Sequence, residues 1–176
     1  MKSPFAPIRS VENYLPLEDH GLIGDGDTAA LVGRDGAISW LCVPRFDCPP
    51  LFCGILDAQR GGVFRIAPEN LAESRQYYEG DSGVLVTEMR GDAGLVRLTD
   101  ALLLHAGADL REDASAGRRE LLRWVAALKG PVRLEGRFDP FGGARVEPRS
   151  GGLLVRCPQQ PELELHLLSS IPLQGL

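Results

Sequence analysis

The sequence lacks any apolar run near the roughly 20 residues that a helix needs to cross a bilayer, which argues against a membrane partner. Its first residues also lack the apolar stretch of a secretory signal, so we expect a cytoplasmic protein. The 19 basic residues are scattered along the chain, and the formal net charge is −5. Since nucleic-acid binding needs basic residues gathered on one face, we predict no nucleic-acid partner.

Residues suited to metal, disulfide or cofactor chemistry are also few. The spacing of the four cysteines matches no CxxC pair or zinc ribbon, and the three histidines lie far apart. No GxGxxG segment opens a helix, and no GxSxG nucleophile motif occurs. We therefore predict no metal site and no cofactor, and we expect buried, reduced thiols at Cys42, Cys48, Cys53 and Cys157.

What the sequence does contain is frequent punctuation by turn residues. Its 21 glycines and 13 prolines leave mostly short segments between them, which favours strands over long helices. Two apolar stretches, TAALVG and AISWLC, are joined at Asp35-Gly36, a dipeptide typical of a tight hairpin turn. Alternating apolar residues predict three further hairpins and a final strand, over residues 83–104, 118–140, 144–158 and 163–170. Together these elements predict an antiparallel β-sandwich built from consecutive hairpins.

Three local expectations complete this prediction. Residues 49–58 have prolines at their start and glycines soon after their end, which predicts one short helix. The polar, alanine- and glycine-rich stretch AGADLREDASAGRRE (106–120) predicts a surface loop. Trp40 shares a strand with Ile38 and Cys42 at a period of two, so we expect it in the core.

The segment 21–57 carries a recognisable series of motifs. It reads IGDG, TAALV, RDG, WLC and PRFD in this order. The series resembles the opening block of the trehalase-like amino-terminal domain found in bacterial and archaeal members of glycoside hydrolase family 15. The later pieces GGVFRIAP, SRQYYEGDSGVLVTE, LTDALLL and RRELLRWV recur in kind and order in that domain. The resemblance covers nearly the whole chain, and it is strongest before Asp57 and weakest after Asp139.

The resemblance implies both an architecture and an activity. Residues 1–176 would form one N-terminal, supersandwich-like β domain ahead of a catalytic (α/α)6 barrel that this chain does not include. In the family the barrel holds the two glutamates of an inverting α-glycosidase, one of them just after a tryptophan. Here Trp40 is followed by Leu-Cys and Trp124 by Val-Ala, so we expect no catalytic residue in this chain and no hydrolysis by it alone.

The expected partners also follow from the resemblance. They are the barrel of the same protein and an α-glucoside such as trehalose, maltose or a maltooligosaccharide. Because a domain interface buries roughly 600 to 1,500 Å², the isolated chain should expose an apolar patch, through which it could also dimerise.

Arg45, Phe46 and Asp47 form the candidate substrate-binding cluster. An arginine, an aromatic ring and a carboxylate on one corner can hydrogen-bond sugar hydroxyls and stack on a sugar ring, at the rim of the barrel pocket. The competing interpretation is structural: Arg45 and Asp47 pair with each other or with the backbone, and Phe46 enters the core. Asp25 and Asp27 lack the further ligands of a calcium loop and predict a polar turn instead.

An alternative function remains open at this point. A free-standing β-sandwich that binds carbohydrate or a protein partner would show a surface row of aromatic residues. The chain has only eleven aromatic residues, and Tyr77-Tyr78 is their sole adjacent pair. Neighbouring strand residues point to opposite faces, so this pair cannot form one flat platform.

Overall fold

The computed structural model describes residues 4–112 and 116–171, and this part of the chain is almost entirely β. The first seven strands are β1 (Ala6–Pro7), β2 (His20–Gly24), β3 (Ala29–Gly33), β4 (Ala37–Cys42), β5 (Pro50–Phe52), β6 (Val63–Pro68) and β7 (Glu73–Tyr78). The others are β8 (Leu85–Arg90), β9 (Leu95–Leu104), β10 (Gly117–Lys129), β11 (Leu134–Asp139), β12 (Arg145–Arg149), β13 (Gly152–Cys157) and β14 (Gln160–Leu168). A short 3₁₀ turn, η1 (Leu17–Asp19), precedes β2. None of the helices in the described residues has the length and apolar character needed to span a membrane.

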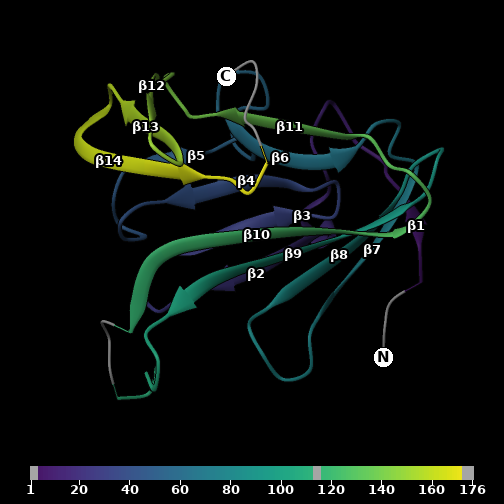
Figure 1. Cartoon of the computed structure of the whole chain (residues 1–176), viewed down its shortest axis with the longest axis horizontal. Coiled ribbons are helices and arrows are strands. Elements are labelled where there is room, and N and C mark those ends of the chain that lie inside the picture. The colour runs from purple at the N-terminus through teal and green to yellow at the C-terminus, as the bar shows by residue number, and fades with distance from the viewer. Residues whose placement is uncertain (1–3, 113–115, 172–176) are drawn as a thin grey trace.

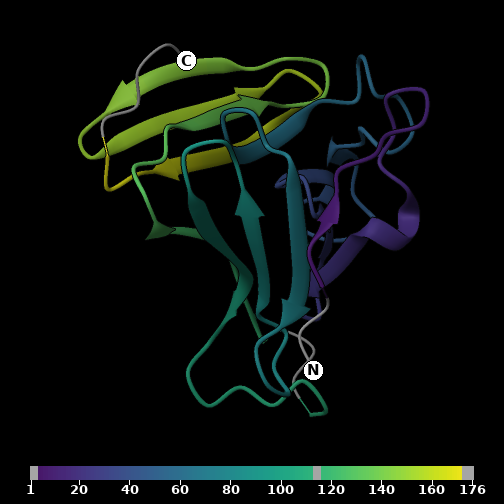
Figure 2. The same cartoon turned by 90° about the vertical axis from the view of Figure 1, so that its right-hand side faces the viewer.

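Three antiparallel sheets make up the fold (Figure 1). Sheet 1 has the order β1-β7-β8-β9-β10, and sheet 2 has the order β11-β6-β4-β3-β2 with β5 paired to β4. Sheet 3, of order β12-β13-β14, lies at one end of the molecule (Figure 2). One apolar cluster joins all three, because it includes Ile38 from sheet 2, Leu85 from sheet 1 and Val155 from sheet 3. The predicted mainly β, antiparallel fold is confirmed.

The hairpin at Asp35-Gly36 is present, and its glycine is required. The Gly36 amide donates to the Gly33 carbonyl at 2.9 Å, which closes the turn between β3 and β4. Gly36 has a φ of 83°, and a Cβ added there would lie 2.1 Å from the Ile66 carbonyl oxygen. The neighbouring strand β6 therefore approaches the turn so closely that no side chain fits.

Two other predicted hairpins and the final strand are also confirmed. Strands β8 and β9 pair across the turn at 91–94, and β12 and β13 pair across the turn at 150–151. Strand β14 then pairs with β13. In the predicted loop 106–120, residues 106–112 lie outside any strand, whereas residues 117–120 begin β10, and residues 113–115 lie outside the described residues.

The predicted hairpin over 118–140 is wrong. Strand β10 pairs with β9 in sheet 1, and β11 pairs with β6 in sheet 2, so the chain crosses between sheets after Lys129. Gly130 does turn the chain there, with a φ of 72°. A glycine-proline turn fixes where a strand ends but not which strand comes next to it, and two open sheet edges offered competing partners.

The predicted helix at residues 49–58 is also wrong. Residues Pro50–Phe52 form β5, and the chain then turns, with Leu56 and Asp57 donating amides to the Cys53 carbonyl at 2.9 and 3.2 Å. Phe52 explains the difference, because it is fully buried with its ring centroid 5.6 Å from that of Phe138. Pairing of β5 with β4 places this ring in the core. The stabilisation from burying the ring outweighs the local preference for a helix that the flanking prolines and glycines indicate.

Trp40 is half-buried and does not lie in the core as predicted. On β3, Val32 pairs with Ile38 while Leu31 pairs with Trp40, so Ser39 is an extra residue in β4. This β-bulge breaks the period of two and turns Ile38 and Trp40 to opposite faces. Ile38 is fully buried against Val32, whereas Trp40 shares its face with the half-buried Leu31.

Polar side chains join sheets 1 and 2 through the core. Arg123 on β10 donates to both carboxylate oxygens of Asp100, to the Phe64 carbonyl at 2.6 Å and to the Gly36 carbonyl at 2.8 Å. Both ionic side chains are buried, with 3% and 0% of their surface exposed. The guanidinium also lies over the Phe64 ring. Since the pair satisfies two backbone carbonyls of the opposite sheet, it fixes how the two sheets face each other.

Two further side chains tie the sheets together at their margins. Arg34, in the turn after β3, donates to the carbonyls of Ala6 and Pro7 at 2.8 and 2.7 Å and so fastens β1. Tyr78, at the end of β7, accepts from the Leu22 amide at 3.0 Å and donates to the Leu22 carbonyl at 2.7 Å. Its hydroxyl thus completes the outer side of β2, which stands at the end of sheet 2.

Candidate functional site

The predicted cluster Arg45, Phe46 and Asp47 forms an exposed corner after β4. Arg45 donates to both carboxylate oxygens of Asp47, at 2.9 and 3.0 Å. The hydrogen bonds and charge of Arg45 hold the pKa of Asp47 below its usual range. About half of each side chain remains exposed, so each ion can still meet a ligand. The pairing expected by the structural interpretation is present, but Phe46 is 69% exposed and does not enter the core.

Backbone hydrogen bonds hold the corner in place from two sides. The Phe46 amide donates to the Asp27 carbonyl at 3.0 Å, and the Gln160 side chain donates to the Pro49 carbonyl at 3.0 Å. Asp27 belongs to a polar turn, as predicted, in which one oxygen of Asp25 accepts from the amides of Asp27 and Thr28 at 3.1 and 2.9 Å. The corner therefore presents an arginine, an exposed ring and a carboxylate on a fixed support.

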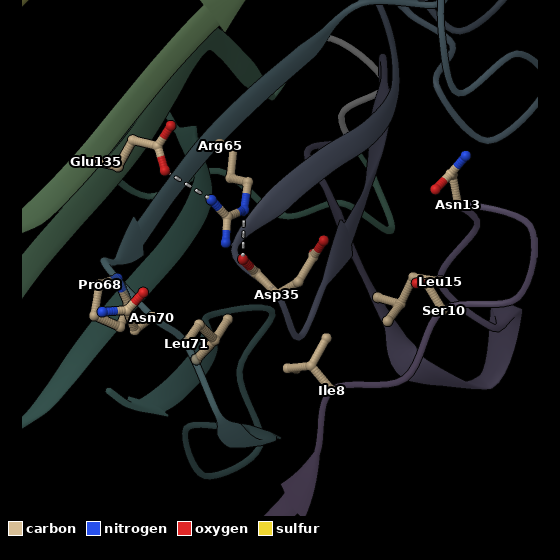
Figure 3. A pocket seen from close by; sticks show the side chains of 10 residues that line it. All are labelled: Ile8, Ser10, Asn13, Leu15, Asp35, Arg65, Pro68, Asn70, Leu71 and Glu135. Carbon is tan, nitrogen blue, oxygen red and sulfur yellow. Dashed lines mark hydrogen bonds and ion pairs between the residues drawn. The ribbon is translucent and has the colours of Figure 1, made fainter. Parts of the chain in front are cut away.

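A groove that the sequence did not reveal lies on the outer side of sheet 2 (Figure 3). It consists of two adjoining cavities of about 320 and 410 Å³ that share Asn13, Leu15, Asp35, Arg65 and Glu135. Their walls come from the N-terminal segment 8–17, the turn after β3, and strands β6 and β11. Segments more than 100 residues apart in the sequence thus meet around one hollow.

Arg65 is the central polar residue of the groove. Its Nε donates to the Asp35 carbonyl at 3.2 Å, and one Nη approaches Glu135 at 3.4 Å (Figure 3). The second Nη has no hydrogen-bond partner among the described residues. Glu135 keeps 62% of its side chain exposed, so the long contact to Arg65 leaves most of its accepting capacity available.

The turns that border the groove adopt an uncommon backbone conformation. Four non-glycine residues in the described chain have positive φ, and three of them are Glu12 (53°), Asn13 (70°) and Asn70 (55°). Val11 and Tyr14 exchange two backbone hydrogen bonds of 2.9 Å around the first turn. Left-handed conformations cost energy outside glycine, and they concentrate where a protein holds a particular side chain in place.

Other chemistry is limited in the part of the chain that the structure describes. It contains no group of three or more histidine, cysteine or carboxylate residues arranged to hold a metal ion. The four cysteines are unpaired; three are buried and Cys48 is half-buried, close to the prediction. Burial raises the pKa of the Cys42, Cys53 and Cys157 thiols, which keeps them protonated and unreactive.

A buried carboxylate lies on the outer face of sheet 1. Glu88 is 2% exposed and accepts hydrogen bonds from Arg75 at 2.6 Å, Arg97 at 2.9 Å and Tyr77 at 2.9 Å. Burial alone would raise its pKa, but the two arginines and the tyrosine outweigh that effect and lower the pKa to about 2. All four groups are engaged with one another, so the cluster holds β7, β8 and β9 together.

Comparison with known proteins agrees with the sequence motifs. The family model of the trehalase-like N-terminal domain matches residues 10–165. The chain is 34% identical over 137 residues to a trehalase of Thermoplasma volcanium, covering 74% of this chain and 20% of that protein. It is 30% identical over 179 residues to a trehalase of Mycolicibacterium smegmatis, covering 90% of this chain and 26% of that protein.

A third relative is trehalase 2 of Sulfolobus acidocaldarius, which is 40% identical over 150 residues, covering 84% of this chain and 23% of that protein. No solved structure gave a significant match. The chain thus spans about a fifth to a quarter of the length of the curated relatives it matches. Since the family model covers most of its residues, the chain belongs to the trehalase-like N-terminal domain family.

Proposed function

We propose that this chain is the non-catalytic N-terminal domain of an inverting glycosidase of family 15, joined to a catalytic (α/α)6 barrel and located in the cytoplasm. The family match over residues 10–165 carries the proposal. The relatives extend far beyond the matched part and are named trehalases, which favours trehalose over a maltooligosaccharide as the α-glucoside. In this view residues 1–176 form one domain.

The carboxyl groups of the described chain support a non-catalytic role. Inverting hydrolysis needs a general acid, with a raised pKa, and a general base about 6.5 to 9.5 Å apart on either side of the substrate. Burial raises the pKa of Asp100, but this group lies between two sheets in contact with Arg123 and out of reach of a substrate. Glu88 has the opposite shift and is enclosed by its own arginines.

The surface of sheet 1 offers a place for the barrel to dock. On the outward side of β10, Leu122 and Trp124 are 46% and 65% exposed. They alternate with the inward-facing Arg123 and so lie on one face. Leu128, which is 43% exposed, lies at the β-bulge between Ala127 and Lys129, where this alternation ends. Exposed apolar side chains of this kind are typical of a surface that a second domain covers. The corner of Arg45, Phe46 and Asp47 would in turn complete the rim of the barrel pocket.

The proposal is tested by comparing two purified products of the same gene. The 176-residue chain should release no glucose from trehalose above a heat-treated control, whereas the full natural product should hydrolyse it and give β-glucose from one half of each molecule. Hydrolysis by the 176-residue chain alone would overturn the non-catalytic role. A natural product with the mass of this chain would instead favour a free-standing binding module.

The role of the corner is tested in the full-length protein. We expect Arg45→Ala to raise the KM for trehalose, because an exposed guanidinium that reaches a sugar hydroxyl contributes to binding. Arg60→Ala is the matched control, since Arg60 forms a similar ion pair with Asp57 at 2.9 Å in the loop between β5 and β6. Equal kinetics for the Arg45 variant, the control and the natural enzyme would remove the corner from the substrate site.

A further inference from the structure

The groove on sheet 2 has a chemical character of its own, separate from the corner. Its charged lining consists of Arg65 and Arg137 against Asp35 and Glu135, and Arg137 also pairs with Asp139 at 2.9 Å, so the groove has no excess of positive charge. A site for a phosphate or another anion would carry an excess of positive charge. The groove therefore suits a neutral ligand.

The remaining lining favours a ligand rich in hydroxyl groups. A hydroxyl both donates and accepts, and the groove offers donor-only groups, acceptor-only groups and amides that do both. The sequence has two asparagines in total, at positions 13 and 70, and both line this groove although 57 positions separate them. Their amides have no hydrogen-bond partner among the described residues, and the second Nη of Arg65 is also unpaired there.

The apolar part of the lining fits the other surface of a sugar. Ile8, Pro68 and Leu71 provide an aliphatic wall on the side of Asn70, whereas Asn13 lies across the hollow (Figure 3). In the adjoining cavity Tyr14 is 37% exposed, and its hydroxyl is held between the Leu56 carbonyl and the Ala58 amide at 3.5 and 3.3 Å. A sugar ring presents C–H groups on its faces and hydroxyls around its edge, which matches this division.

We infer that this groove is a non-catalytic binding site for a neutral sugar of one or two hexose rings. Each cavity falls within the range of volumes typical of small-molecule sites, roughly 300 to 1,000 Å³. The asparagine amides, Arg65 and Glu135 bind ring hydroxyls, while the aliphatic wall and Tyr14 receive the ring face. Only the choice of α-glucosides as probes rests on the proposed function, because the lining residues themselves favour a neutral ligand with several hydroxyl groups.

The test is a titration of the ¹⁵N-labelled 176-residue chain with trehalose, maltose and glucose, followed by two-dimensional NMR. We expect saturable shifts that cluster on segments 8–15, 65–71 and 135–137. Glucose 6-phosphate is the anionic comparison and should bind more weakly than glucose. The proposal is overturned by an absence of saturable shifts, by tighter binding of the phosphate, or by shifts confined to the corner at residues 45–47.

A variant that removes the amides without disturbing the backbone sharpens the test. Asn13 and Asn70 have positive φ, so the double substitution N13G/N70G keeps conformations that glycine adopts freely. We expect it to weaken sugar binding about tenfold or more, because two hydrogen-bonding side chains are lost. Arg119→Gly, at the fourth left-handed position and on β10, is the control and should bind normally.

The two proposals fail in different ways. Unchanged binding in the double variant would overturn the groove site and leave the proposed domain role untouched, since that role is measured as hydrolysis by the full-length protein. Conversely, hydrolysis by the isolated chain would overturn the domain role while the titration could still place a sugar in the groove.

Discussion

Replacing Glu88 by glutamine tests whether the buried cluster on sheet 1 stabilises the fold through its charge. Glutamine keeps the size of the side chain but cannot carry the negative charge that Arg75 and Arg97 face. Both arginines are partly exposed, with 25% and 37% of their side chains accessible, so water can solvate them in the variant. The loss should therefore reflect the missing charge pairs rather than stranded buried cations.

The size of the effect follows from the pKa. A fall from 4.5 to about 2 on folding corresponds to about 3 kcal/mol of stability near neutral pH. Because the pKa is lowered in the folded state, this contribution is fully present above about pH 4.5. As the pH drops below 4.5 the unfolded chain takes up the proton first, and the contribution declines until it vanishes near pH 2.

Urea unfolding followed by circular dichroism, repeated from pH 7 to pH 2.5, measures the difference between the natural chain and Glu88→Gln. We expect about 3 kcal/mol at pH 7 and a steady decrease in the difference below pH 4.5. Glu120→Gln is the matched control on the same sheet, where an exposed pair with Arg118 should contribute less than about 1 kcal/mol. A difference that stays constant across the pH range would refute the electrostatic explanation.

Two other substitutions test a close contact within sheet 2 and the ion pair between sheets 1 and 2. Gly36→Ala should destabilise the chain by at least about 2 kcal/mol in thermal unfolding, because the added Cβ meets the Ile66 carbonyl. Gly151→Ala is the control and should lower the stability less, because Gly151 has a similar φ of 85° but open space around it. Arg123→Met should lower the free energy of unfolding in urea by about 3 to 5 kcal/mol, because it leaves Asp100 buried and unpaired. Adding Asp100→Leu should restore part of that stability. No recovery in the double variant would contradict this reasoning.

Much of the fold is local enough to be predicted from the sequence. The turn at Asp35-Gly36 needs a glycine with positive φ, and the strands around it alternate in a way that a sheet requires. The failures occur where a distant contact decides. Phe52 extends β5 because its ring packs against Phe138, and β11 pairs with β6 although β10 lies just before it in the chain. Neither of these two arrangements can be predicted from the residues that are adjacent in the sequence.

The candidate sites show the same contrast between local features, which the sequence predicts, and features that depend on distant contacts. The corner at Arg45 could be predicted because its three residues are consecutive, and their ion pair needs no other element. The groove could not, since Asn13, Arg65 and Glu135 belong to three segments that meet only after two sheets have formed. The rarity of asparagine in this chain was the one available signal, but it acquires meaning only when both copies are found in one hollow.

The hydroxyl of Tyr78 has a consequence for how this domain behaves in a crowded solution. A strand at the end of a sheet normally offers its backbone to any passing chain, which is a common route to aggregation. At Leu22, which is 55% exposed, the phenol of Tyr78 already occupies both backbone groups. A strand from another molecule must displace that phenol before it can pair with β2. A side chain from sheet 1 thus protects the edge of sheet 2 against aggregation.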